Sequence, residues 1–150
     1  MRVDLDHERK YLAEEDPWGI GAADSERYDL YVAAIRDRAR RGSVLDVGCG
    51  FGAMLARLRE DFDELHGIEL SAEAIRKGSE RYPFIAFEQG SIELLERTAA
   101  DARRFDAIVF SDVLYYVEER EKRAALRWIA RHLAPDGFAF IAAYSPGTGS

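Results

Sequence analysis

Apolar and polar positions alternate along the chain in blocks that predict a succession of strands and helices. Apolar runs predict five strands, at residues 43–48, 64–70, 84–88, 105–111 and 138–144. Helical spacing predicts helices over about 25–40, 53–61, 92–100 and 119–133, and another capped by Ser71. Strands separated by helices pair in parallel through right-handed crossovers. The expected fold class is therefore α/β, a three-layer α/β/α sandwich around a mostly parallel sheet of about five strands.

Three of the predicted helices have a clear apolar face, which in the helix over 53–61 is formed by Leu55, Leu58 and Phe62. In the first helix this face is formed by Tyr28, Tyr31, Val32 and Ile35. In the last helix the expected inward residues are Leu126, Ile129 and Leu133. The turn Pro135-Asp136-Gly137 is expected to close that last helix.

The length of 150 residues fits a single domain with a core at 25–145. Residues 1–24 are polar and contain Asp16-Pro17-Trp18-Gly19, which predicts an N-terminal arm or lid, and residues 146–150 are expected to form a flexible tail. No strand pattern follows the fifth strand. Because an uncovered apolar edge strand promotes aggregation, a homodimer that pairs through this strand is one expected way to cover it.

Composition narrows the class of protein. The net charge of −7 argues against a nucleic-acid partner, because phosphate binding needs clustered positive charge. No apolar run approaches the roughly 18 residues of a membrane span, and the polar start has no signal-peptide core. The single cysteine, Cys49, forms no internal disulfide and fits a cytoplasmic protein. No cysteine, histidine and aspartate cluster has metal-ligand spacing, so no metal is expected.

The most informative segment is the run from Val44 to Gly52, where an apolar strand breaks into a loop with glycine at every second position. Glycines gather where the backbone turns sharply or approaches a ligand, because they lack a Cβ. In α/β sheets this first turn is where nucleotide-like ligands bind. The loop satisfies the dinucleotide pattern G-x-G-x-x-G/A, ending at Ala53, and equally D-x-G-x-G-x-G from Asp46. Glu69, at the end of the second strand, suits ribose hydroxyls under either interpretation.

Four motifs in order distinguish between these interpretations. They are Asp46-Val47-Gly48-Cys49-Gly50-Phe51-Gly52, Glu69-Leu70-Ser71, the stretch from Phe105 to Tyr116, and Leu133-Ala134-Pro135-Asp136-Gly137-Phe138. With them the chain resembles the class I S-adenosylmethionine-dependent methyltransferases. The resemblance implies strand order 3-2-1-4-5, S-adenosyl-L-methionine as cofactor, and methyl transfer to nitrogen or oxygen of a small molecule, a metabolite or sugar. It also implies that the family's usual two terminal strands are lacking here. The segment 16–19 resembles an arm of the subset that includes the nodulation N-methyltransferases.

The resemblance further implies which residues bind the cofactor. The backbone of Gly48, Cys49, Gly50 and Gly52 lies against its methionine portion, and Asp46 orients this loop or reaches the ammonium group through water.

The remaining cofactor contacts are implied at the ends of the second and third strands. Glu69 accepts the ribose hydroxyls, while Leu70 and Ile92 enclose the adenine. Ser91 stands where family members usually carry an aspartate that accepts from the adenine amino group, and a hydroxyl also accepts such a bond. The other expected contacts are Tyr11 and Trp18, in a lid over the cofactor, and Ser111.

The acceptor site is expected after the fourth strand, at the carboxyl edge of the sheet. Tyr115 or Tyr116 is expected to line the acceptor pocket, and Asp112 to attract a protonated amine. The alternative is that one tyrosine packs beneath the loop and Asp112 caps the next turn. Holding nucleophile, methyl carbon and sulfur in line is worth roughly 7–11 kcal/mol, so little covalent help is needed.

Two other functions stay open at this stage. A non-catalytic or partner-dependent cofactor-binding module is suggested by Ser91 and by the absence of further strands. A dinucleotide oxidoreductase would need a substrate domain after the sheet, for which 150 residues leave no room. The leading hypothesis is a small-molecule methyltransferase.

Overall fold

The computed structural model of this protein describes residues 25–111 and 117–142. The helices are α2 (Ser25–Arg38), α3 (Ala53–Ala56), α4 (Ala72–Arg81) and α5 (Glu119–His132), with two 3₁₀ segments, η1 (Ile92–Arg97) and η2 (Ala99–Ala102). The strands are β1 (Ser43–Val47), β2 (Glu64–Glu69), β3 (Ile85–Gln89), β4 (Phe105–Ser111) and β5 (Leu133–Ala142).

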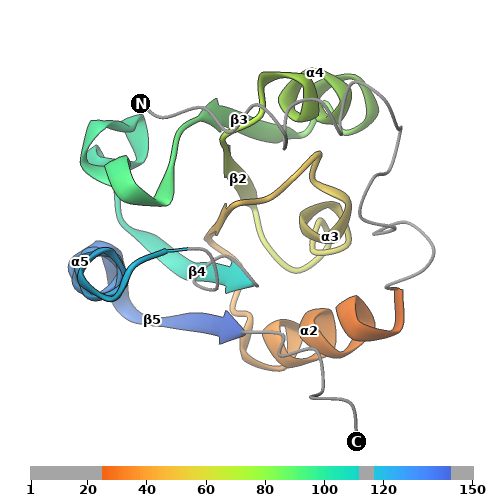
Figure 1. The fold of residues 1–150 in the computed structure, drawn as a ribbon. Helices are drawn as coiled ribbons and strands as arrows, with labels where there is room; N and C mark the ends of the chain where they lie inside the picture. The colour runs from red at the N-terminus through yellow and green to blue at the C-terminus, as the bar shows by residue number, and fades with distance from the viewer. Residues whose placement is uncertain (1–24, 112–116, 143–150) are drawn as a thin grey trace, which may run out of the picture.

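The five strands form one sheet in the order β3-β2-β1-β4-β5, and every neighbouring pair is parallel. Helices α2, α3 and α4 cover one face of the sheet, and α5 with the 3₁₀ segments covers the other (Figure 1). The predicted α/β/α sandwich and its strand order are thus confirmed. Because all strands run the same way, their carboxyl ends meet at one edge, where open α/β sheets bind ligands.

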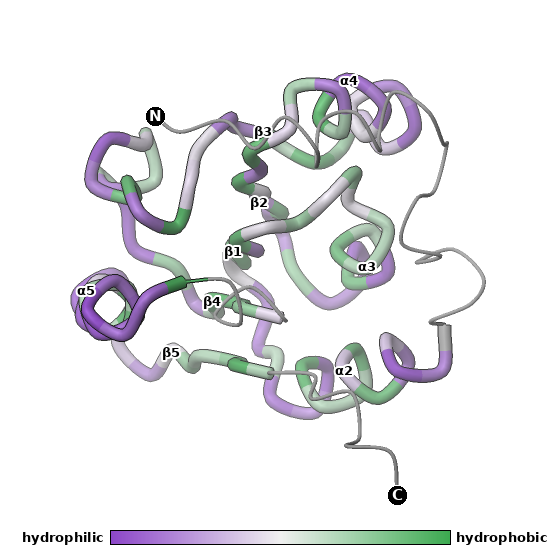
Figure 2. The backbone as a smooth tube through the Cα atoms, viewed as in Figure 1, coloured by the Kyte–Doolittle hydropathy of each residue, from purple (hydrophilic) through white to green (hydrophobic). Residues whose placement is uncertain are grey.

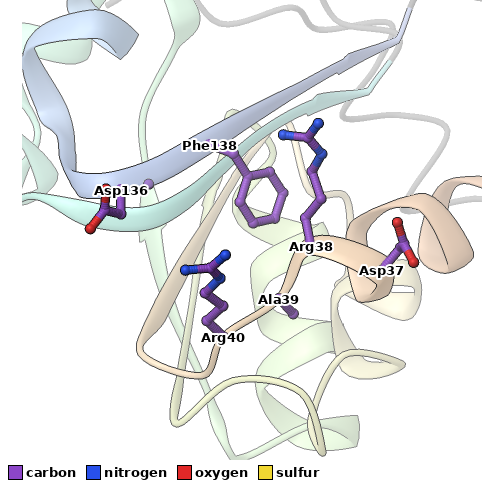
Figure 3. A pocket seen from close by; sticks show the side chains of 7 residues that line it. Asp37, Arg38, Ala39, Arg40, Asp136 and Phe138 are labelled. Atoms are coloured by element: carbon purple, nitrogen blue, oxygen red, sulfur yellow. The ribbon is translucent and has the colours of Figure 1, made fainter.

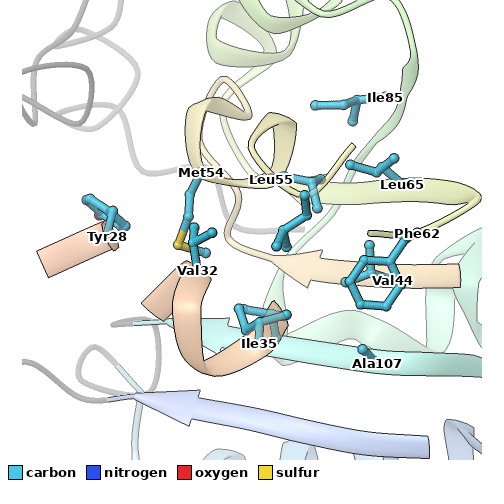
Figure 4. Close-up of a cluster of buried hydrophobic side chains, with 12 residues drawn as sticks. Tyr28, Val32, Ile35, Val44, Met54, Leu55, Phe62, Leu65, Ile85 and Ala107 are labelled. Atoms are coloured by element: carbon cyan, nitrogen blue, oxygen red, sulfur yellow. The ribbon is translucent and has the colours of Figure 1, made fainter. Parts of the chain in front are cut away.

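Side chains of β1 alternate between two cores. Val44 belongs to a cluster with Val32 of α2 and Leu55 of α3 (Figure 4). Leu45 and Val47 belong to a second cluster, with α5, on the opposite face. Figure 2 shows hydrophobic residues along the strands, while α5 is largely hydrophilic. Since successive side chains of a strand point to opposite faces, the residue between Leu45 and Val47 faces α2, α3 and α4.

Two predicted helices are shorter or less regular than expected. The helix predicted over 53–61 ends at Ala56, and the chain continues in turns, with the Leu58 amide donating to the Leu55 carbonyl at 3.0 Å. Leu58 and Phe62 are nevertheless buried. The apolar spacing in 53–62 therefore marks residues of the core, although the segment is not one continuous helix. The helix predicted over 92–100 is replaced by η1 and η2, which are separated by Thr98 in an extended conformation.

The inward face of α5 differs from the prediction. Leu126 is 39% exposed, so its expected burial is wrong, whereas Ile129 is buried as predicted. The Trp128 indole stacks on the His132 ring, with 3.9 Å between centroids, and its Nε1 donates to an Asp101 carboxylate oxygen at 2.9 Å. This large buried side chain, rather than Leu126, sets the side of α5 that packs on the sheet.

Strand β5 starts earlier than predicted and contains an irregularity. It begins at Leu133, directly after α5, and its pairing with β4 shifts between Phe105, opposite Leu133, and Ala107, opposite Phe138. The predicted helix-closing turn at 135–137 is this bulge. Among the described residues β5 pairs with β4 alone, and Ile141 on it is 44% exposed. The homodimer through β5 stays a prediction, which light scattering across a concentration series tests.

A side-chain hydrogen bond of Asp106 connects the start of β1 to β4. Its carboxylate accepts a hydrogen bond from the Ser43 amide at 2.8 Å, and Gly42, at φ 78°, leaves no space for a Cβ beside it. Replacing Asp106 by alanine leaves that part-buried amide without its acceptor, so we expect the free energy of unfolding to fall by about 1–3 kcal/mol. Urea denaturation measures the change, with the exposed Asp37→Ala as control. Equal stability of the two variants would contradict this role of Asp106.

Candidate functional site

The loop after β1 has the backbone conformation that its glycines predict. Gly48, Gly50 and Gly52 have φ values of 78°, 61° and 92°, in a region that side chains with a Cβ rarely adopt. The amides of Gly48 and Cys49 donate to the Ile68 carbonyl at 2.7 and 3.2 Å. The loop is therefore fixed against the carboxyl end of β2, and Gly52 leads into α3.

The Glu69 carboxylate connects the glycine loop to the start of α4. It is 4% exposed, and its two oxygens accept hydrogen bonds from the Gly50 amide at 3.0 Å and the Ser71 amide at 2.7 Å. The Ser71 hydroxyl in turn accepts from the Ala74 amide at 3.0 Å and caps α4. A carboxylate oxygen can accept more than one hydrogen bond, so the Glu69 carboxylate is a group of the kind that binds ligand hydroxyls.

Asp46 lies beside Glu69, but its carboxyl group has fewer hydrogen-bond partners. It is 2% exposed, and its Oδ1 has no hydrogen-bond partner among the described residues. Burial, and then the nearby charge of Glu69, raises the pKa of Asp46 to about 8. Alternation along the strands places Asp46, Glu69 and Ser111 on the same face of the sheet. The site thus contains an orphaned buried oxygen next to a glycine loop, which fits a ligand with a donor or cationic group.

Two glycines outside the loop shape the site, and the motif analysis missed both. A Cβ at Gly78 of α4 would lie 2.4 Å from the backbone oxygen of Phe51, so α4 presses directly on the loop. A Cβ at Gly67 of β2 would lie 2.6 Å from the Cys49 sulfur. A glycine in the middle of an amphipathic helix was the available signal for Gly78, because such a residue weakens the helix unless packing requires it.

The pairing of Gly67 with Cys49 gives a test of loop packing. Gly67→Ala places a methyl group against the thiol, so we expect it to lower the free energy of unfolding by about 1–3 kcal/mol. Adding Cys49→Ala removes the sulfur and is expected to restore much of that loss, which a double-mutant cycle in urea measures. Additive effects of the two substitutions would show that their side chains do not compete for this space.

The residues predicted to hold adenine lie at the ends of β2 and β3. The Leu70 carbonyl accepts from the Gln89 side chain at 3.0 Å, which joins the two strand ends. Ser91 caps η1, its hydroxyl accepting from the Glu93 amide at 3.0 Å, and Ile92 packs partly against the α5-side core. Leu70, Ser91 and Ile92 are each partly exposed, so all three are accessible at this edge. Their contacts with adenine stay a prediction.

Several predicted site residues lie outside the described residues. These are Tyr11, Trp18, Asp112, Tyr115 and Tyr116. Ser111, the last described residue of β4, is partly exposed and ends that strand at the carboxyl edge of the sheet. The acceptor site therefore stays a prediction.

Away from the glycine loop, the described part of the chain contains a hollow, but it contains no metal-ligating cluster and no membrane-spanning helix. A hollow of about 510 Å³ lies between the end of α2 and the start of β5, lined by residues 37–40 and 136–138 (Figure 3). It lies at the amino ends of the strands, opposite the glycine loop. Within 25–111 and 117–142, no group of three metal-ligating side chains gathers. No helix in those ranges has the length and apolarity needed to cross a membrane.

Comparison with known proteins identifies the class. Residues 44–137 match the family described as "Methyltransferase domain", and this chain belongs to that family. The resemblance inferred from the four motifs is thus confirmed.

Particular relatives refine the comparison. Nodulation protein S of Azorhizobium caulinodans is 34% identical over 86% of this chain and 63% of its own length. A dTDP-3-amino-3,6-dideoxy-alpha-D-glucopyranose N,N-dimethyltransferase of Streptomyces fradiae is 32% identical over 77% of this chain and 45% of its own. This chain therefore spans about half to two thirds of these relatives.

Solved structures agree with the sequence relatives. The N-methyltransferase NodS of Bradyrhizobium japonicum, in complex with S-adenosyl-L-homocysteine, superposes with a TM-score of 0.78 at 26% identity, over 89% of this chain and 70% of NodS. A sugar N-methyltransferase of Streptoalloteichus superposes with a TM-score of 0.69 at 30% identity, over 88% of this chain and 53% of that one.

Proposed function

We propose that this chain binds S-adenosyl-L-methionine at the carboxyl edge of its sheet and transfers the methyl group to a small molecule, most directly to the amino group of a sugar. The observation that carries the proposal is the glycine loop fixed to Glu69 beside the orphaned Asp46, in a chain of the methyltransferase domain family. The amino-sugar acceptor is supported by the relatives, among which are several amino-sugar N,N-dimethyltransferases.

Different residues of the chain are assigned to different parts of the cofactor. The bound cofactor supplies an electrophilic methyl group on a sulfonium. The positive-φ backbone from Gly48 to Gly52 leaves room for its methionine end, because no Cβ projects from the glycines. Glu69, held by two backbone amides, presents carboxylate oxygens to the ribose hydroxyls. Leu70 and Ile92 offer apolar surface for adenine.

The acceptor side of the site is assigned to the segment after β4. Asp112 attracts a protonated amine, and Tyr115 or Tyr116 lines the acceptor pocket. A nitrogen nucleophile needs its lone pair and the loss of one proton, so the main task of these residues is orientation.

A transfer assay tests this function. The chain is incubated with methyl-labelled cofactor and a panel of nucleotide-linked amino sugars, and the products are identified by mass spectrometry. We expect methylated amine, with turnover reduced in Asp112→Asn and in Tyr115→Phe or Tyr116→Phe. Cofactor binding without transfer to any member of a broad panel, including hydroxyl acceptors, would favour the non-catalytic binding module instead.

A further inference from the structure

Two carboxylic acids lie buried next to each other at the candidate site. Asp46 on β1 and Glu69 on β2 are both nearly inaccessible and face the same side of the sheet. Asp46 pairs with Gly67, two residues before Glu69, and residue 67 has no side chain to separate the two groups. Two neighbouring carboxylates in a buried place do not both stay ionised at low cost. One of them is therefore expected to hold a proton.

The hydrogen bonds indicate which acid holds the proton. Glu69 accepts hydrogen bonds from backbone amides on both oxygens, so each of its oxygens has a donor. Asp46 Oδ1 is fully buried and accepts no hydrogen bond from the described residues. A buried carboxylate oxygen without a donor is costly, whereas a neutral carboxyl is tolerated. The proton therefore belongs on Asp46, in keeping with its pKa, which burial and Glu69 raise to about 8.

The neighbouring groups leave this assignment unchanged. From the loop, Cys49 contributes a thiol whose pKa is raised well above its usual value by burial and then by the charges of Asp46 and Glu69, so it stays neutral. From β4, the residue opposite Asp46 is Val109, which does not titrate. Within the described residues, Glu69 is the one charged side chain that perturbs Asp46.

We propose that Asp46 carries a proton before the cofactor binds and that the positive charge of the methionine end displaces it into solvent, an inference that rests on the proposed function. The carboxyl O–H bond breaks, its electron pair stays on Asp46, and buffer takes the proton. The resulting carboxylate pairs with the cationic group of the ligand. That group supplies the hydrogen-bond donor that Asp46 lacks in the free protein. Asp46 is thereby a binding residue whose charge appears only with the ligand.

The displacement makes binding depend on pH. Below about pH 8 the free protein holds the proton, so binding must release it and affinity rises as pH rises, by at most about tenfold per pH unit. Above that pH the carboxyl is already ionised and this dependence disappears. At pH 7 binding is expected to release about one proton.

Calorimetry in buffers of different ionisation enthalpy counts this proton. S-adenosylmethionine and S-adenosylhomocysteine are titrated at pH 7 in phosphate and in Tris, into the wild-type chain and Asp46→Asn. The ligand's own amino group contributes equally to both proteins, so the difference between them isolates Asp46. We expect the wild type to release about one proton more than Asp46→Asn, whose affinity is weaker and lacks the pH dependence that Asp46 contributes.

A measurement without ligand keeps the inference testable if Asp46→Asn binds too weakly. The carboxyl ¹³C shift of Asp46 is followed by NMR, and we expect a protonated carboxyl at pH 7 that ionises near pH 8. An ionised Asp46 at pH 7, or wild-type binding with no proton release, overturns the inference and leaves the proposed function standing. A protonated Asp46 in a folded chain that binds neither ligand overturns the proposed function, and with it the displacement.

Discussion

Replacing Gly78 by valine is expected to abolish measurable binding of S-adenosylmethionine and to lower the free energy of unfolding by about 1–3 kcal/mol. The reason is steric. A Cβ at this position would lie 2.4 Å from the Phe51 backbone oxygen and 2.6 Å from the Phe87 ring, and backbone does not move aside as a flexible side chain does. To fit valine, α4 must retreat from the loop or the loop must shift, and either change spoils the backbone path from Gly48 to Gly52.

Calorimetric titration and urea denaturation measure the two effects. Ser79→Val is the matched control, because it places the same β-branched residue on the exposed side of the same helix. The free energy of unfolding of this control is expected to fall only by the small amount that the lower helix propensity of valine costs, and its cofactor binding is expected to be unchanged. Binding of wild-type strength by Gly78→Val would show that the contact between α4 and the loop does not shape the site.

Glu69→Gln is expected to weaken cofactor binding by about 100-fold, equivalent to about 2.7 kcal/mol, because hydrogen bonds to a charged acceptor contribute more than those to a neutral one. The carboxylate of Glu69 accepts hydrogen bonds from the backbone N–H groups of Gly50 and Ser71. The glutamine side chain would turn its own NH₂ group toward one of these two donors, which would lose its acceptor. We therefore expect the free energy of unfolding to fall as well, by about 1–3 kcal/mol.

The control for Glu69 is Glu96→Gln, which makes the same chemical change on an exposed residue of η1. Calorimetry gives the affinities, and thermal unfolding reports the stability of both variants. If Glu69→Gln binds S-adenosylmethionine as tightly as Glu96→Gln does, Glu69 does not take the ribose hydroxyls, and the assignment of this site fails.

Much of the fold follows from short-range signals in the sequence. In β1 and β4 apolar residues occupy both faces of the strand rather than alternating with polar ones, because these strands are covered on both faces, and such runs are visible without a structure. The loop was equally readable, since three alternating glycines predict a backbone that only glycine adopts easily, and all three have positive φ. Ser71 was correctly expected to cap a helix, because a serine before an apolar helix start has that role.

The features that sequence reasoning missed depend on contacts between distant segments. Leu126 fits the helical period as well as Trp128 does, and only the packing of the indole on His132 and Asp101 decides which side of α5 faces inward. Gly78 is separated in sequence from the loop it supports. Whether a buried oxygen finds a donor depends on the groups that the fold brings around it, so no local pattern predicts that Asp46 Oδ1 has none among the described residues.

The measurement that tests the central claim most directly is calorimetric titration of the purified chain with S-adenosylmethionine and S-adenosylhomocysteine, with NADH as the negative control. The account predicts saturable one-site binding of both sulfur ligands, no binding of NADH, and loss of binding in Gly50→Val, whose side chain is strained at φ 61° in the loop. A folded chain that binds neither sulfur ligand, or that binds them equally well with valine at position 50, would contradict it.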